Sequence, residues 1–101
     1  MSIDLSKVEI HENEEKRRFE ARVGEHTAVM NRYYSGGNLV ITHTGVPDEL
    51  SGQGLASHMA KSVLDGARQR GQSVVPICPF VASYIERHPE YQDLVFKGPD
   101  Q

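Results

Sequence analysis

The chain has 101 residues, of which 38% are hydrophobic and 25% are charged, and its formal net charge is −3. This length suits one domain, which we predict to span 1–101 with its core at 8–95 and loose termini at 1–7 and 97–101. The acidic balance disfavours nucleic-acid binding, no apolar run is long enough for a membrane span or a leader, and the single cysteine, Cys78, excludes an internal disulfide.

Four short strands are predicted first. A strand at 8–10 precedes a polar turn at 13–15. Phe19, Ala21 and Val23 then alternate with charged residues, which is typical of a half-buried strand. Glycine-containing turns at 24–25 and 35–38 separate further strands at 27–34 and 39–44. Strands joined by such short turns form an antiparallel meander.

A long helix at about 52–70 follows, with an apolar stripe along one face: Leu55, Met59, Val63, Leu64 and Ala67. A fifth strand at 73–77 and a second helix at 80–87 complete the core. A strand–helix–strand crossover of this length favours parallel pairing of the fourth and fifth strands. The predicted fold class is therefore α+β, with a mixed five-stranded sheet (an antiparallel meander, then a parallel crossover) and two helices.

Between the fourth strand and the long helix lies a glycine loop, S-G-Q-G-L-A-S at 51–57. A strand, a glycine loop and a helix in this order can present backbone N–H groups to a phosphate. The same glycines also allow a tight turn with Ser51 as the helix N-cap. From the loop alone, an anion-binding site and a purely structural turn are equally favoured.

The segment P-D-E-L-S-G-Q-G-L-A-S at 47–57 resembles the acyl-CoA pyrophosphate loop of the GNAT superfamily of N-acetyltransferases. That loop follows the pattern Gln/Arg-x-x-Gly-x-Gly/Ala. Gly54 and Ala56 match its last two fixed positions, whereas Ser51 departs from the first. More specific are H-T-x-V-P at 43–47, C-P-F at 78–80 and H-P-E-Y at 88–91, which resemble the small, single-domain GNAT-like branch.

The resemblance implies an abbreviated acyl-CoA N-acyltransferase fold that uses acetyl-CoA as cosubstrate and an amine, on a small molecule or a protein, as acceptor. In that fold the fourth and fifth strands splay apart, and the pantetheine arm of CoA would lie beside Gly45 and Val46. The pyrophosphate would face the loop and the first helical turn, formed by Gly52, Gly54, Leu55, Ala56 and Ser57.

Three side chains are candidates for catalysis. Cys78 follows the fifth strand and precedes a helix, a position that favours a thiolate, although a lone cysteine is also commonly a small buried hydrophobe. His43 is in phase with Leu39 and Ile41, so it is predicted on the apolar face beside Cys78, either as a core residue or as a base. The family often has Glu where this chain has Gly45. Because this chain lacks that acidic side chain, His43 becomes the stronger candidate for the general base on this strand.

The third candidate is Tyr84. The wider superfamily often has a tyrosine near this position that protonates the departing CoA thiolate; the alternative is a core aromatic. The other histidines show no metal-ligand spacing, and no metal is expected.

The leading hypothesis is thus a cytoplasmic, acetyl-CoA-dependent N-acetyltransferase, a monomer or weak dimer that binds neither membrane nor nucleic acid. Two alternatives stay open. One is a CoA- or acyl-CoA-binding protein without a defined acceptor, since the short turn at 13–15 leaves no room for the helices that build an acceptor pocket in larger members. The other is a phosphate-loop fold unrelated to CoA.

Overall fold

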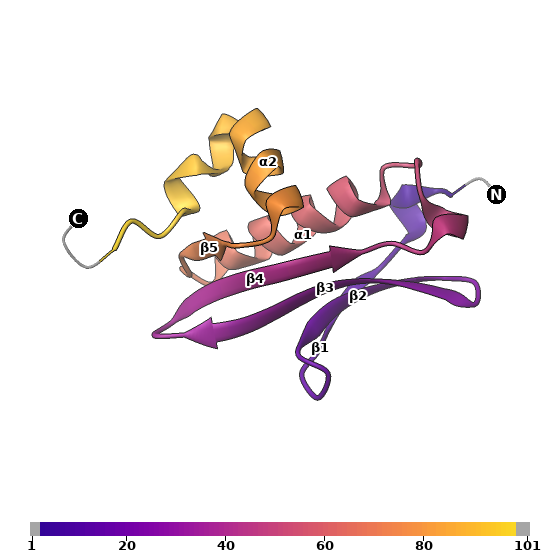
Figure 1. Ribbon diagram of the computed structural model, residues 1–101, viewed down its shortest axis with the longest axis horizontal. Coiled ribbons are helices and arrows are strands. Elements are labelled where there is room, and N and C mark those ends of the chain that lie inside the picture. The colour runs from indigo at the N-terminus through magenta and orange to yellow at the C-terminus, as the bar shows by residue number, and fades with distance from the viewer. Residues whose placement is uncertain (1–2, 99–101) are drawn as a thin grey trace.

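The computed structural model describes residues 3–98 and contains one mixed sheet with helices (Figure 1). The strands are β1 (Ile10–Asn13), β2 (Arg18–Val23), β3 (His26–Ser35), β4 (Asn38–Gly45) and β5 (Val74–Pro76). The α-helices are α1 (Leu55–Gln69) and α2 (Pro79–Arg87), and three 3-10 helices that the sequence did not predict are η1 (Leu5–Lys7), η2 (Asp48–Leu50) and η3 (Pro89–Leu94). Across residues 3–98, no helix combines the length and apolar character that crossing a membrane requires.

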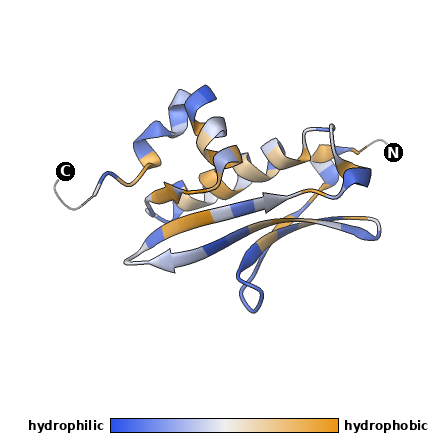
Figure 2. Cartoon of the chain, in the orientation of Figure 1, coloured by the Kyte–Doolittle hydropathy of each residue, from blue (hydrophilic) through white to orange (hydrophobic). Residues whose placement is uncertain are grey.

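The predicted sheet topology is confirmed. The strand order is β1-β2-β3-β4-β5, with antiparallel pairs up to β4 and a parallel pair between β4 and β5. Figure 1 shows α1 and α2 on the same side of this sheet, which we name the covered face. The opposite side, the open face, carries no helix or strand of the described residues. The molecule is therefore two layers thick, and Figure 2 shows its apolar segments gathered where the layers meet.

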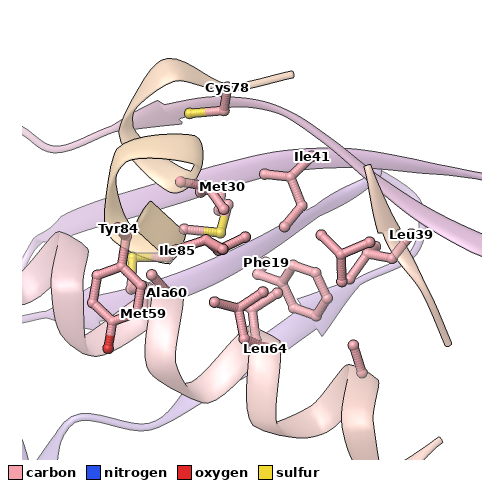
Figure 3. Close-up of a cluster of buried hydrophobic side chains, with 14 of the residues drawn as sticks. Phe19, Met30, Leu39, Ile41, Met59, Ala60, Leu64, Cys78, Tyr84 and Ile85 are labelled. Atoms are coloured by element: carbon pink, nitrogen blue, oxygen red, sulfur yellow. The ribbon is translucent and has the colours of Figure 1, made fainter. Parts of the chain in front are cut away.

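The core lies between the covered face and the two helices, as Figure 3 shows. The predicted α1 stripe is confirmed, because Leu55, Met59, Val63, Leu64 and Ala67 are all buried. Facing them from the strands are Phe19, Met30, Leu39 and Ile41, and α2 adds Val81, Tyr84 and Ile85. Fully burying one such large apolar side chain stabilises a fold by roughly 1.5–3 kcal/mol. This packing fixes α1, and with it the glycine loop, against the sheet.

A β-bulge interrupts the pairing of β3 with β4. Asn31 lies opposite His43, but Arg32 lies opposite Ile41, so Thr42 is an extra residue on β4. One extra residue resets the alternation of side chains between the two faces. Ile41 is buried on the covered face, whereas His43 is exposed on the open face. The prediction that His43 continues the phase of Leu39 and Ile41 is therefore wrong.

The start of α1 also differs from prediction. Ser51 does not cap the helix: it ends η2, and its hydroxyl donates to the carbonyl oxygen of Asp48 at 2.9 Å. The N-cap is Gly54, with φ at 82°, and the first helical residue is Leu55. Glycine adopts this left-handed conformation without the strain that a side chain brings. The loop thus extends three residues further than the Ser51 interpretation required.

On the covered face, polar contacts join the ends of β1 and β3. The Arg32 side chain is buried, with its Nη2 at 2.8 Å from Glu12 Oε2 and 2.9 Å from Glu14 Oε1. Tyr34, also on this face, donates its hydroxyl to Glu12 and stacks on the Arg32 guanidinium at 4.6 Å. These contacts tie the β1–β2 hairpin to the rest of the sheet.

Polar contacts of η3 hold the C-terminal segment against α1. The Tyr91 hydroxyl donates to Asp65 Oδ1 at 2.7 Å, and Arg68 Nη1 lies 2.9 Å from Asp93 Oδ2. Burial, followed by the hydrogen bond to the Asp65 carboxylate, raises the pKa of Tyr91 to about 12, so the phenol donates this bond throughout the neutral range.

Beyond η3 the chain runs along the outer edge of β5. Val95 forms a parallel bridge with the core residue Val74, and the Phe96 N–H donates to the Val74 carbonyl oxygen at 2.8 Å. Because neighbouring residues of an extended segment alternate between faces, Phe96 lies on the open face. Val95 is the last residue of the core predicted from sequence, and Phe96 lies just beyond it. Of the termini predicted to be loose, residues 1–2 and 99–101 lie outside the described residues.

Candidate functional site

The first part of the candidate site is the N-terminus of α1. The first backbone N–H groups of any α-helix lack partners within the helix. Here the N-cap is Gly54, and across residues 3–98 no side chain makes a capping hydrogen bond to this helix end. The first turn of α1 also contains no acidic residue, so nothing already offsets the positive end of the helix dipole. This end of α1 is therefore suited to bind an anion.

A pocket of about 300 Å³ opens at this helix end. It lies between the end of β4, the glycine loop and the first turn of α2. Its lining consists of Val46, Leu50, Ser51, Gly52, Gly54, Leu55, Ala56, Ser57 and Phe80. We name it the loop pocket. Of the residues that the sequence predicted to bind CoA, all but Gly45 line it.

A second pocket, of about 350 Å³, adjoins the first and shares Gly54 and Ser57 with it. It lies between α1 and the C-terminal half of α2. Four of its lining side chains are basic or can become cationic, and no acidic residue of the described chain lines it; the four are His58, Lys61, Arg87 and His88. We name it the basic pocket. Sequence reasoning missed it, because the packing of α2 on α1 brings these residues together.

A larger hollow, about 580 Å³, lies on the other side of α1, above β1. It contains none of the residues predicted to be catalytic or to bind CoA. Its lining contains two acidic side chains, Glu12 and Asp65, and two basic ones, Lys61 and Arg70. Lys61 and Asp65 form an ion pair with each other. We therefore place the candidate site at the two smaller pockets, where the uncapped helix end and the predicted residues coincide.

Beyond the loop pocket, β4 and β5 separate. The parallel pairing stops at Ile41 and Pro76, while the pairing of β4 with β3 continues to Gly45. One more hydrogen bond links the two strands' paths, from the Cys78 N–H to the Ile41 carbonyl oxygen at 2.9 Å. The chain then turns into α2. The side of β4 from 42 to 45 that faces away from β3 thus pairs with no strand among residues 3–98.

Cys78 lies at this separation, as the N-cap residue of α2. It is 2% exposed, and its Sγ is 3.3 Å from the hydroxyl of Thr44 on β4. Thr44 was not among the residues predicted from the sequence. The bulge at Thr42 is the reason that Thr44 contacts the thiol, because without the extra residue the alternation would turn His43 to this face.

His43 lies on the open face instead. Its ring is beside Gly45, where an added Cβ would meet His43 Nε2 at 3.4 Å and the Val29 side chain at 3.4 Å. His43 is exposed, while Cys78 is buried on the covered face. The structure therefore does not bring the two together as a Cys–His pair, although both residues flank the place where β4 and β5 separate.

Tyr84 is packed in the core of α2. Its ring stacks on His88, with centroids 3.9 Å apart, and it lines the basic pocket. Figure 3 shows its hydroxyl pointing away from Cys78. Burial raises the pKa of Tyr84, which keeps the phenol protonated at neutral pH. This position agrees better with the core-aromatic alternative than with a proton donor beside Cys78, where the thioester is expected.

The mixed sheet with separating β4 and β5, together with a glycine loop at an uncapped helix, is the arrangement expected of an acyl-CoA N-acyltransferase fold. The model of the family described as GCN5-related N-acetyl-transferase matches residues 18–94. The chain belongs to this family, and the resemblance noted from its motifs is confirmed at this level.

Similar proteins agree with this assignment. The NATD1 protein of Gallus gallus is 31% identical over 95 residues, which cover 91% of this chain and 86% of that protein. The NATD1 protein of Homo sapiens is 31% identical over 85 residues, covering 81% and 75%. The solution structure of a GCN5-like protein from Staphylococcus aureus superposes with a TM-score of 0.69 at 29% identity, covering 90% of each chain.

Proposed function

We propose that this protein binds acetyl-CoA and transfers its acetyl group to an amine. The observation that carries the proposal is the loop pocket: an uncapped helix N-terminus faces it, and residues matching the acyl-CoA loop motif line it. The pyrophosphate would accept hydrogen bonds from N–H groups of Gly52, Gly54, Leu55, Ala56 and Ser57. Family membership supports this use of the loop.

The adjoining basic pocket supports CoA over a smaller ligand. CoA carries a third phosphate on its ribose, and two cations lie beside the loop pocket: Arg87, and Lys61, whose Nζ is paired with Asp65 Oδ2 at 2.7 Å. The pantetheine arm would run in the opposite direction, along the unpaired side of β4 beside Gly45 and Val46. This path brings the thioester to Cys78 and Thr44.

The reaction would be a direct or stepwise acyl transfer. The amine nitrogen forms a bond to the acyl carbon, the carbon–sulfur bond of the thioester breaks, and the proton that the amine loses finally resides on the CoA thiol. His43 is assigned to accept this proton, since its exposed ring is available to an acceptor on the open face. Cys78 is assigned to the acyl end, where its thiol either holds the acetyl group transiently or orients the thioester.

The experiment that tests the proposal is a thermal melt with CoA, acetyl-CoA and ATP, followed by an assay of CoA release with amines. Ligand at ~100 times its dissociation constant stabilises a protein by roughly 2.7 kcal/mol. For a domain of this size, that raises the midpoint by on the order of 10–20 °C. We expect this shift with CoA and acetyl-CoA and a much smaller one with ATP.

Three outcomes are informative. The absence of a shift at saturating acetyl-CoA overturns the proposal and leaves the glycine loop as a structural turn. A shift without CoA release for any amine favours the alternative of a CoA-binding protein without transfer. A larger shift with ATP than with CoA favours a phosphate-loop fold of another kind.

A further inference from the structure

The open face carries exposed apolar side chains at one end. Tyr33, Ile77 and Phe96 are 47%, 57% and 42% exposed, which is unusual for side chains of this size. They surround two smaller apolar residues. We name this set the apolar patch; it consists of Tyr33, Val40, Val75, Ile77 and Phe96.

The pairing register places these residues next to one another. Tyr33 lies opposite Val40, and Val40 lies opposite Val75, so the three form a row across β3, β4 and β5. Directly paired residues share a face of the sheet. Val40 itself is only 4% exposed, so the exposed part of the apolar patch consists of the larger side chains around it. Neighbouring exposed apolar side chains of this size mark a place where another molecule binds.

The apolar patch is continuous with the proposed acyl end. Ile77 directly precedes the buried Cys78 and points away from the core. On the other side of the separation between β4 and β5, His43 is exposed on the same open face as the row. A molecule lying on the apolar patch thus has Ile77 and His43 at the edge nearest the acyl end. This continuity favours a reactant of the transfer over a second copy of the chain.

Charge on the open face argues against a polycationic acceptor. Glu20 lies on this face, in the row that runs through Val29 to Gly45. Its carboxylate is already paired, with Oε2 at 2.7 Å from Arg18 Nε and Oε1 at 3.2 Å from His11 Nε2. No acidic residue belongs to the apolar patch. Recognition of the acceptor there has to depend on apolar contact.

We propose that the acceptor is a primary amine that carries an uncharged apolar group, either an aromatic ring or a hydrocarbon chain. That group packs on the apolar patch, and the amino group reaches the thioester between Ile77 and His43. This inference rests on the proposed acetyl transfer and adds the chemical class of the acceptor. The transfer itself is balanced as above, with the acetyl group moving from sulfur to nitrogen and the proton to the CoA thiol.

The kinetic test compares 2-phenylethylamine with ethanolamine and spermidine at saturating acetyl-CoA. We expect KM for 2-phenylethylamine to be lower than for the other two by ~10-fold or more, as apolar groups in a binding site discriminate by about this factor or above. Tyr33→Ser raises that KM by ~10-fold and leaves the KM for acetyl-CoA unchanged. Tyr34→Ser is the matched control, since the neighbouring tyrosine lies on the covered face, and it leaves the KM for the amine unchanged.

A second measurement does not need turnover. Titration of 2-phenylethylamine into the ¹⁵N-labelled protein, with and without CoA, should shift the backbone amide signals of Tyr33, Val40 and Val75. Failure of CoA to stabilise the protein overturns the carrier site but leaves this titration interpretable, so the two proposals fail separately.

The inference is overturned by a preference for spermidine, by amide shifts confined to the covered face, or by an unchanged KM in Tyr33→Ser. A dimer seen by sedimentation that dissociates in both Tyr33→Ser and Ile77→Ser also overturns it, because the apolar patch is then an interface between copies.

Discussion

The two faces of the sheet differ in what covers them and in what their side chains can do. The covered face is packed with apolar residues under α1 and α2, and the loop pocket and Cys78 lie on this side. The open face carries a charged cluster, in which Arg18 and His11 hold Glu20, together with His43 and the apolar patch. The covered face thus contains the core and the pocket proposed for CoA, whereas no helix or strand of the described residues covers the open face.

If the proposed function is right, acetyl-CoA and the acceptor approach the sheet from opposite faces. The bulge at Thr42 is central to this division, because it turns Thr44 to the covered face and His43 to the open face within two residues. A small protein without extra helices can in this way present both chemistries at the place where β4 and β5 separate. Variants on the two faces should therefore have separable effects.

The largest effect is expected on the covered face, from Ala56→Glu. A carboxylate in the first turn of α1 opposes the pyrophosphate, so the stabilisation by CoA of on the order of 10–20 °C should disappear. The helix dipole favours a negative charge there, so the free protein keeps its stability or gains about 0.3–1 kcal/mol.

Thermal melts with and without CoA measure both effects of Ala56→Glu. Ser62→Glu, which places the same charge further along α1 and outside the loop pocket, is the control and should retain the CoA shift. A normal CoA shift in Ala56→Glu would contradict an anion site at this helix end.

Cys78→Ala tests the same face at the acyl end. CoA release with an amine should be abolished, while the thermal shift with CoA persists, because the thiol is assigned to the acyl group and not to the pyrophosphate. Val81→Ala removes a buried apolar side chain from α2 without touching the thiol, and it should keep turnover despite a lower melting midpoint. Equal turnover in Cys78→Ala and the wild type would leave Cys78 as a core residue only.

On the open face, His43→Gln should reduce kcat/KM by ~10²-fold or more, the range for a general base. The thermal shift with CoA should stay the same, which separates this variant from Ala56→Glu. His11→Gln changes another exposed histidine of the open face, one that contacts Glu20, and should have little effect. An unchanged kcat/KM in His43→Gln would count against a base at this position.

The smallest effect is expected from Tyr84→Phe. The hydroxyl points away from Cys78, so we expect kcat to change by less than about 3-fold, well below the 10²-fold of a general acid. The stacking of the ring on His88 remains possible in the variant. Single-turnover measurement of CoA release checks this. A loss of ~10²-fold would restore Tyr84 as the proton donor and require the chain to rearrange on binding CoA.

Much of the fold was predictable because the spacing of apolar residues indicates both the type of element and the face that is buried. Phe19 and Ala21 alternate with charged neighbours, and Leu55, Met59 and Val63 recur at helical spacing, so β2 and α1 could be predicted closely. The first strand was predicted at 8–10 but spans Ile10–Asn13. The bulge could not be predicted. In T-H-T at 42–44 no apolar residue marks a phase, so nothing in the sequence signals that Thr42 is extra.

Only the glycine loop of the candidate site could be predicted from the sequence. The loop residues are adjacent in the chain, and a motif finds them together. The basic pocket depends instead on the packing of α2 across α1, which brings Arg87 and His88 to Lys61. Thr44 escaped notice because a threonine in a strand is ordinary until its partner, Cys78, is known.

The short segment at Val95 and Phe96 has a consequence for solubility. β5 has only three residues, and its outer edge would otherwise expose unpaired backbone groups beside the apolar patch. Such an edge is a template on which other chains can add strands and grow into fibrillar aggregates. The Phe96 N–H occupies the Val74 carbonyl oxygen, so a strand of another chain cannot pair with β5 at this residue. The protein can therefore keep the apolar patch exposed beside this edge with less tendency to associate along it.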